Sequence, residues 1–132
     1  MTGYAVVLAS EELEKLTAAS TIASVAAASD VPVEIFVTMN ALAAFEHETV
    51  ETGAFETGTL GQAMLESEDV QVPLFVDQLR DAKEMGPLSV YACSMAMDMM
   101  GRSLEDYVGV FDEKLGVAGF LNHAEDKQIV FV

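Results

Sequence analysis

The chain has 132 residues, of which 22 are acidic and 6 are basic, and its formal net charge is −16. This length fits a single domain, residues 1–132, and a hydrophobic fraction of 52% is too high for a disordered chain. The charge excludes nucleic acid and anionic lipid as favoured partners, no apolar run is long enough to span a membrane, and a lone cysteine cannot form an internal disulfide, so a cytoplasmic protein is expected.

The first third of the chain alternates apolar runs with an alanine-rich stretch. Residues 3–8, GYAVVL, predict a strand that is buried on both faces. Ser10 is a suitable N-cap for a helix that runs to about Ser29, with leucine and alanines along one face at three- and four-residue spacing. Residues 33–37, VEIFV, predict a second strand, and a short helix is expected over residues 40–45.

The segment over residues 46–68 is rich in Glu, Thr and Gly and has little periodicity. It predicts a long loop or lid, since long loops in compact domains are often functional. His47 lies between Glu46 and Glu48, which is a candidate metal patch. A solvated loop residue is the favoured interpretation, because so few ligands are present.

The second half of the chain continues the alternation of helices and strands. The pattern predicts helices over residues 72–84 and 94–100, a capping-box turn at 103–106, a helical turn near Asn122, and strands over 88–92, 115–118 and 129–132. Gly86 and Gly101 stand where the two helices should end. The order of elements predicts an α/β fold: a small doubly wound, mostly parallel sheet of about five strands with helices on both faces.

Cys93 is the only thiol of the chain, and it lies where a predicted strand ends and a predicted helix begins. Ligands of parallel sheets bind at the carboxyl ends of strands, and the free amides of a helix N-terminus favour thiolate over thiol. A free cysteine is also among the most buried residue types and often only fills space. The position therefore favours a reactive thiol over a packing residue. A Cys–His pair would require contact in space, for which His47 is a better candidate than His123.

Methionines crowd the predicted helix after the cysteine: Met95, Met97, Met99 and Met100. Soft sulfur ligands beside a thiolate suit Cu(I). However, Met95 and Met99 share one helix face while Met97 points elsewhere. This spread favours adaptable packing against the sheet and against a neighbouring subunit. No metal and no organic cofactor is predicted.

The acidic residues are spread along the whole chain and do not collect in a tail. An acidic surface of this kind suits a high-salt cytoplasm, because salt screens the self-repulsion of the charges. The composition therefore predicts a halophilic protein from a haloarchaeon. An acidic mesophilic protein is the alternative.

The run YACSMAMDMMG, residues 91–101, resembles the cysteine motif of the DsrE/DsrF-like family of sulfur-relay proteins. The resemblance extends to the first strand, the alanine-rich helix, the VEIFVTMN and VAGF segments and the last apolar strand. It implies a DsrE-like fold, a homotrimer or homohexamer, and sulfur transfer through a cysteine persulfide. Carried onto this sequence, it implies that Cys93 is the persulfide carrier.

The same resemblance implies a substrate pocket beside the thiol, formed by Thr38, Met39, Asn40, Ser94 and Met95. The implied partners are sulfur donor and acceptor proteins of the rhodanese or TusA kind, and the implied activity is that of a sulfurtransferase. Two alternatives stay open. The chain is a non-catalytic oligomeric binding or scaffold module with a structural Cys93, or it is a thiol redox sensor.

Overall fold

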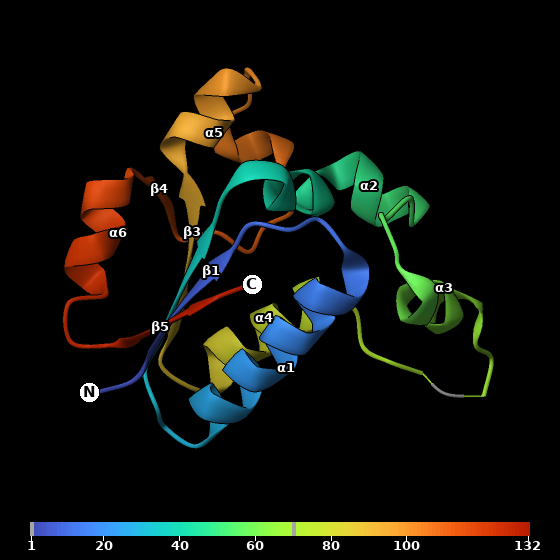
Figure 1. Cartoon of the computed structure of the whole chain (residues 1–132), viewed down its shortest axis with the longest axis horizontal. Coiled ribbons are helices and arrows are strands. Elements are labelled where there is room, and N and C mark those ends of the chain that lie inside the picture. Colours follow the sequence, from blue (N-terminus) through green and yellow to red (C-terminus); the bar gives the residue numbers. More distant parts are fainter. Residues whose placement is uncertain (1, 70) are drawn as a thin grey trace.

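The computed structural model describes residues 2–69 and 71–132. Over these residues, five strands form one parallel sheet in the order β4-β3-β2-β1-β5 (Figure 1). The strands are β1 (Tyr4–Leu8), β2 (Val33–Val37), β3 (Leu88–Cys93), β4 (Glu113–Leu115) and β5 (Gln128–Phe131). The predicted α/β fold with a doubly wound parallel sheet is confirmed.

The order of the strands places a topological switch point between β1 and β5. The chain moves from β1 through β2 and β3 to β4, and then returns to the other side of β1 to form β5. Crevices outside the carboxyl ends of strands at such a reversal are the usual ligand sites of open α/β sheets. The segments after β1, β2 and β3 all lie at this carboxyl edge.

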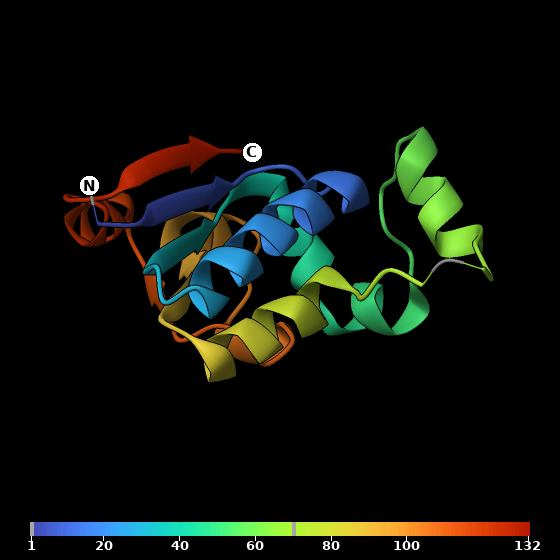
Figure 2. The ribbon, with the colours of Figure 1, turned by 90° about the horizontal axis from the view of Figure 1, so that it is seen from below.

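Helices cover both faces of the sheet, as predicted. Helices α1 (Leu13–Ala28) and α4 (Phe75–Met85) pack side by side on one face, and α6 (Val117–His123) lies on the other (Figures 1 and 2). Phe120 of α6 stacks on Phe36 of β2 with ring centroids 4.6 Å apart. Strand side chains alternate between faces, so Phe36 and its neighbours two residues away point toward α6.

Two helices begin later than the sequence suggested. Helix α1 begins at Leu13, and Ser10 accepts a hydrogen bond from the backbone N–H of Glu12 at 3.1 Å in the turn before it. Helix α4 begins at Phe75, so Pro73 lies ahead of the helix and not in its first turn. Both glycines act as predicted: Gly86 caps α4, and Gly101 follows α5 (Ser94–Met99) with a φ of 64°.

The segment over residues 46–68 is not the irregular loop that was predicted. It contains helices α2 (His47–Thr52) and α3 (Thr59–Glu66), and it follows a 3₁₀ helix, η1 (Met39–Phe45). Helices of six and eight residues are too short for a clear apolar period, which explains the wrong prediction. Gly53 ends α2 in the left-handed region with a φ of 70°.

The strand predicted over residues 115–118 was placed too late. Strand β4 ends at Leu115, and Gly116 is already the N-cap of α6. As a short edge strand, β4 pairs only with β3, and three residue pairs define its register. The predicted capping box is confirmed: Ser103 and Asp106 bracket a 3₁₀ helix, η2 (Leu104–Asp106).

Candidate functional site

Cys93 is the last residue of β3 and the N-cap of α5, as the sequence predicted. On one side, Cys93 pairs with Leu115 of β4. On the other side, Ala92 pairs with Val37 of β2, so the next residue, Thr38, lies beside Cys93. Alternation along β3 puts Cys93 on the same face as Tyr91, which stacks on His123 of α6. The thiol therefore lies on the α6 face of the sheet, between the ends of β2 and β4.

An apolar groove of about 310 Å³ lies on this face, beside α6. It is lined by Val7, Ala9, Phe36, Thr38, Met39, Met95, Val117, Phe120, Leu121, Ile129 and Phe131. None of these side chains carries a charge. Three residues of the predicted substrate pocket, Thr38, Met39 and Met95, belong to this groove.

The thiol itself is closed off from solvent. Cys93 has no exposed surface, whereas Met95 on the groove wall is 48% exposed. Cys93 is not among the residues that line the groove, so its sulfur is not part of the groove surface in this structure. Ser94 is half-buried, and its Oγ lies 3.8 Å from the position that a Cβ on Gly116 would occupy.

The methionines of α5 face different directions, as their spacing predicted. Met97 is buried in the core, whereas Met95, Met99 and Met100 are exposed. Of these four methionines, only Met95 lines the groove. Exposed methionines beside an apolar groove form an adaptable surface.

Both histidines have partners other than the cysteine. The Nε2 atom of His47 lies 3.1 Å from the backbone oxygen of Glu105. His123 stacks on Tyr91 with ring centroids 5.0 Å apart, and its Nδ1 lies 4.0 Å from Oε1 of Glu34. Among the described residues, no group of three or more His, Cys, Asp or Glu side chains is placed to hold a metal ion.

A cluster of Glu34, Tyr91 and His123 escaped the sequence analysis. Burial, and next the neighbouring Glu34 side chain, raise the pKa of Tyr91 to about 12. Glu34 was visible as the single acid in the apolar strand VEIFV, and this was the available signal. Its partners come from β3 and α6, which lie far along the chain.

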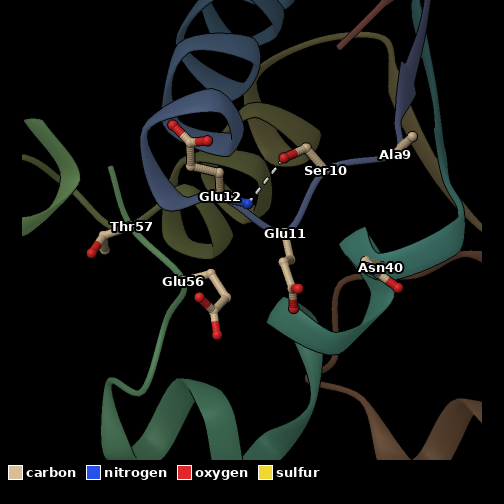
Figure 3. Close-up of a pocket in the computed structure, with 7 residues that line it drawn as sticks. All are labelled: Ala9, Ser10, Glu11, Glu12, Asn40, Glu56 and Thr57. Atoms are coloured by element: carbon tan, nitrogen blue, oxygen red, sulfur yellow. Dashed lines mark hydrogen bonds between the residues drawn. The ribbon is translucent and has the colours of Figure 1, made fainter. Parts of the chain in front are cut away.

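Asn40, the remaining residue of the predicted pocket, lines a different cavity of about 290 Å³. Figure 3 shows this polar pocket, which is lined by Ala9, Ser10, Glu11, Glu12, Asn40, Glu56 and Thr57. It lies at the carboxyl ends of β1 and β2, and the segment before α3 forms part of its wall. Sequence spacing did not reveal it, because Glu56 and Thr57 come from a distant part of the chain.

Comparison with solved structures agrees with the fold. The structure is similar to that of MTH1491, a protein of unknown function from Methanobacterium thermoautotrophicum, with a TM-score of 0.67 and 10% identity over 100% of both chains. At this identity the likeness shows the fold alone. No curated protein matches the chain. None of the described helices is long and apolar enough to cross a membrane.

The family model of the DsrE/DsrF/DrsH-like proteins matches residues 50–132, which is more than half of the chain. The matched part includes Cys93, α5, the groove wall on α6 and the last strand. The chain therefore belongs to the DsrE/DsrF/DrsH-like family.

Proposed function

We propose that the protein is a sulfur carrier or sulfurtransferase that relays sulfane sulfur through a persulfide on Cys93. One observation carries the proposal: the only thiol of this DsrE-like chain lies at the carboxyl end of β3. The neighbouring strand, β2, ends next to Thr38, which lines the groove. The proposed substrate contacts are Thr38, Met39 and Met95 in the groove, and Ser94 next to the thiol in the chain, whereas Asn40 lines the separate polar pocket. The reaction requires no metal and no organic cofactor.

The proposed step exchanges one sulfur–sulfur bond for another. The Cys93 thiol loses its proton, and the thiolate attacks the outer sulfur of a donor persulfide, R–S–SH. The donor S–S bond breaks, a new S–S bond forms on Cys93, and the leaving thiolate takes up a proton as R–SH. A second exchange of the same kind passes the outer sulfur to an acceptor thiol. The proposed donors and acceptors are rhodanese-like or TusA-like proteins.

Burial of the Cys93 thiol supports the competing proposal, a non-catalytic module in which the cysteine is structural. A cysteine without exposed surface is typical of a packing residue, which fits a non-catalytic oligomeric binding or scaffold module. A thiol redox sensor is the third alternative, and it would need a resolving thiol from another molecule, since Cys93 is the only cysteine. Reactivity of the native thiol separates these functions.

The test is transfer of sulfur from a persulfidated rhodanese, followed by intact mass measurement with and without reductant. The expected result is a gain of one sulfur that reductant removes and that Cys93→Ser abolishes. A matched control moves the thiol to an exposed position, in Cys93→Ser/Ser29→Cys. Inorganic polysulfide should modify both thiols, whereas the protein donor should load only Cys93. The proposal fails if Cys93 gains no sulfur and stays inert to iodoacetamide in the folded protein.

We also propose that the chain assembles as a homotrimer or homohexamer in the cytoplasm of a halophile. Around the groove, large apolar side chains remain about half-exposed or more: Met39, Met95, Val117, Leu121, Ile129 and Phe131. On a chain with a net charge of −16, this uncharged surface is where two copies can meet without opposing carboxylates. A partner protein that docks here would also lie next to the path to Cys93.

A further inference from the structure

Residues 56–66, named the arm here, comprise α3 and the segment before it, and they are joined to α1 at few points. Glu14 of α1 accepts hydrogen bonds from the backbone N–H groups of Gly58 at 2.9 Å and Gly61 at 2.8 Å, one on each carboxylate oxygen. Leu13 donates its N–H to the carbonyl of Glu56 at 2.8 Å. Figures 1 and 2 show α3 at the edge of the molecule, outside the layers of the fold.

Apolar burial holds the arm only weakly. Gly61 is the only buried residue of α3, and Leu60 and Leu65 are exposed. A segment with little buried apolar surface opens at low free energy unless other contacts hold it. Met64 is the partly buried side chain of α3 that packs against the core, and the paired hydrogen bonds to Glu14 are the polar link between α3 and the body of the protein.

The two glycines of the arm, Gly58 and Gly61, leave room for the Glu14 carboxylate because they have no Cβ atom. A Cβ on Gly61 would lie 2.2 Å from Oε1 of Glu14, and a Cβ on Gly58 would lie 2.7 Å from Oε2. Neither glycine has a positive φ, so the backbone conformation does not demand glycine there. The close approach of the carboxylate explains why these two positions carry no side chain.

The link depends on the charge of Glu14. The free N–H groups at the start of a helix favour an anion, and hydrogen bonds to a charged acceptor are stronger than those between neutral groups. The hydrogen bond from Gly58 is the largest cause that lowers the pKa of Glu14, desolvation opposes it, and the bond from Gly61 adds to it. Glu12 lies beside the Glu14 carboxylate. The acid Glu11 and the exposed base Lys15 are its neighbours along the chain, and Glu56 is on the arm.

We propose that Glu14 is a latch that holds the arm closed over the polar pocket of Figure 3. Glu56 and Thr57 of the arm form one wall of this pocket, opposite the turn of Ser10, Glu11 and Glu12 (Figure 3). Release of Glu14 frees the arm and opens the pocket at the carboxyl edge of the sheet. The arm belongs to the segment for which the sequence predicts a loop or lid, and the proposal is independent of any reaction at Cys93.

The sign of the pH dependence follows from the lowered pKa. The closed arm binds the ionised carboxylate, so the latch is complete above 4.5, the ordinary pKa of glutamate. It weakens as the pH falls through the lower pKa of Glu14 in the folded protein. Acidification in this range should open the arm of the wild-type protein before the core unfolds.

Amide hydrogen exchange tests the latch directly. In Glu14→Gln the side chain keeps one acceptor oxygen and loses the charge, and in Gly61→Ala the new methyl group displaces the carboxylate without changing charge. Both variants should exchange the amides of Gly58 and of residues 61–66 roughly tenfold faster than wild type at pH 7, with unchanged exchange in β1 and β2. Glu51→Gln on the exposed side of α2 and Gly109→Ala, where a Cβ meets nothing within 4 Å, are the matched controls.

Carboxyl labelling with a carbodiimide and glycine ethyl ester tests whether the arm covers the pocket. Labelling of Glu11 and Glu12, measured against the exposed Glu84, should rise in both latch variants and stay at the wild-type level in both controls. Wild-type arm exchange in both Glu14→Gln and Gly61→Ala would overturn the latch. Faster arm exchange without faster labelling of Glu11 and Glu12 would overturn the cover over the pocket. Unchanged exchange in the core strands verifies that each variant is folded.

Discussion

At the scale of single residues, Tyr91 shows how the tertiary structure changes the chemistry of a side chain. Its ring stacks on His123, and its environment includes the carboxylate of Glu34. Burial and the nearby negative charge both oppose formation of a phenolate. The fold therefore favours the protonated form of Tyr91 over the phenolate.

This predicts a distinct alkaline titration step. A group whose folded pKa is raised gives its full contribution below its ordinary pKa, 10.0 for tyrosine, and loses it as the pH rises through the folded value of about 12. The ultraviolet absorbance of phenolate should show this late step in the wild-type protein, and Tyr91→Phe should remove it. Tyr107, whose pKa burial also raises, stays in the variant as an internal reference. A Tyr91→Phe titration identical to that of wild type would refute the assignment.

At the scale of elements, α6 is a short helix with one buried side chain, Phe120, that packs on the sheet. Phe120 is its buried aromatic residue and stacks on Phe36, whereas Leu121 next to it is 51% exposed. An isolated helix of seven residues is unstable in water, so packing and not helix propensity holds it. Because α6 forms one wall of the groove, this packing also shapes the groove.

Truncation of the two adjacent residues should therefore have unequal effects. Phe120→Ala should lower the free energy of unfolding by about 3–5 kcal/mol, as is usual for a buried phenylalanine. Leu121→Ala should change it by less than about 1 kcal/mol, because the side chain is half in solvent. Urea denaturation measures both values. Alkylation of Cys93 by iodoacetamide should also be faster in Phe120→Ala, because the groove wall loses a ring. Equal free energies of unfolding in the two variants would contradict this role of Phe120.

At the scale of the whole molecule, charge and apolar surface act in opposite directions. Sixteen net negative charges on a 132-residue chain repel one another in the compact state and repel other copies. The uncharged side chains around the groove favour association. The range of the repulsion depends on salt: the Debye length is about 30 Å at 0.01 M ionic strength and about 3 Å at 1 M.

Stability and assembly should therefore both increase with salt. The melting temperature should rise as potassium chloride goes from millimolar to molar, and light scattering should report a trimer or hexamer in high salt that dissociates in low salt. Sodium perchlorate at matched ionic strength separates screening from salting-out, because screening predicts the same early rise in both salts. A melting temperature that is flat over the first few hundred millimolar would contradict the halophilic interpretation, and a monomer at every salt concentration would contradict assembly.

Local patterns in the sequence were sufficient for most of the fold. The apolar runs located all five strands to within a few residues, and Gly86 and Gly101 marked helix ends, because these signals arise from neighbouring residues. The position of Cys93 between a strand and a helix was predictable for the same reason. The predictions failed where elements are short, as in α2, α3 and β4, since few residues carry little periodicity.

The sequence by itself determined the α/β alternation, the acidic surface and the place of the only thiol in the chain. Only the tertiary structure decided that this thiol is buried, that Met39 and Met95 share a groove with α6 and β5, and that Asn40 belongs to a different pocket. It also decided the contacts of Glu14 with Gly58 and Gly61. Each of these features joins residues that are far apart in the chain. Which distant residues meet depends on the order of strands and the packing of helices, and no local pattern of side chains specifies that order.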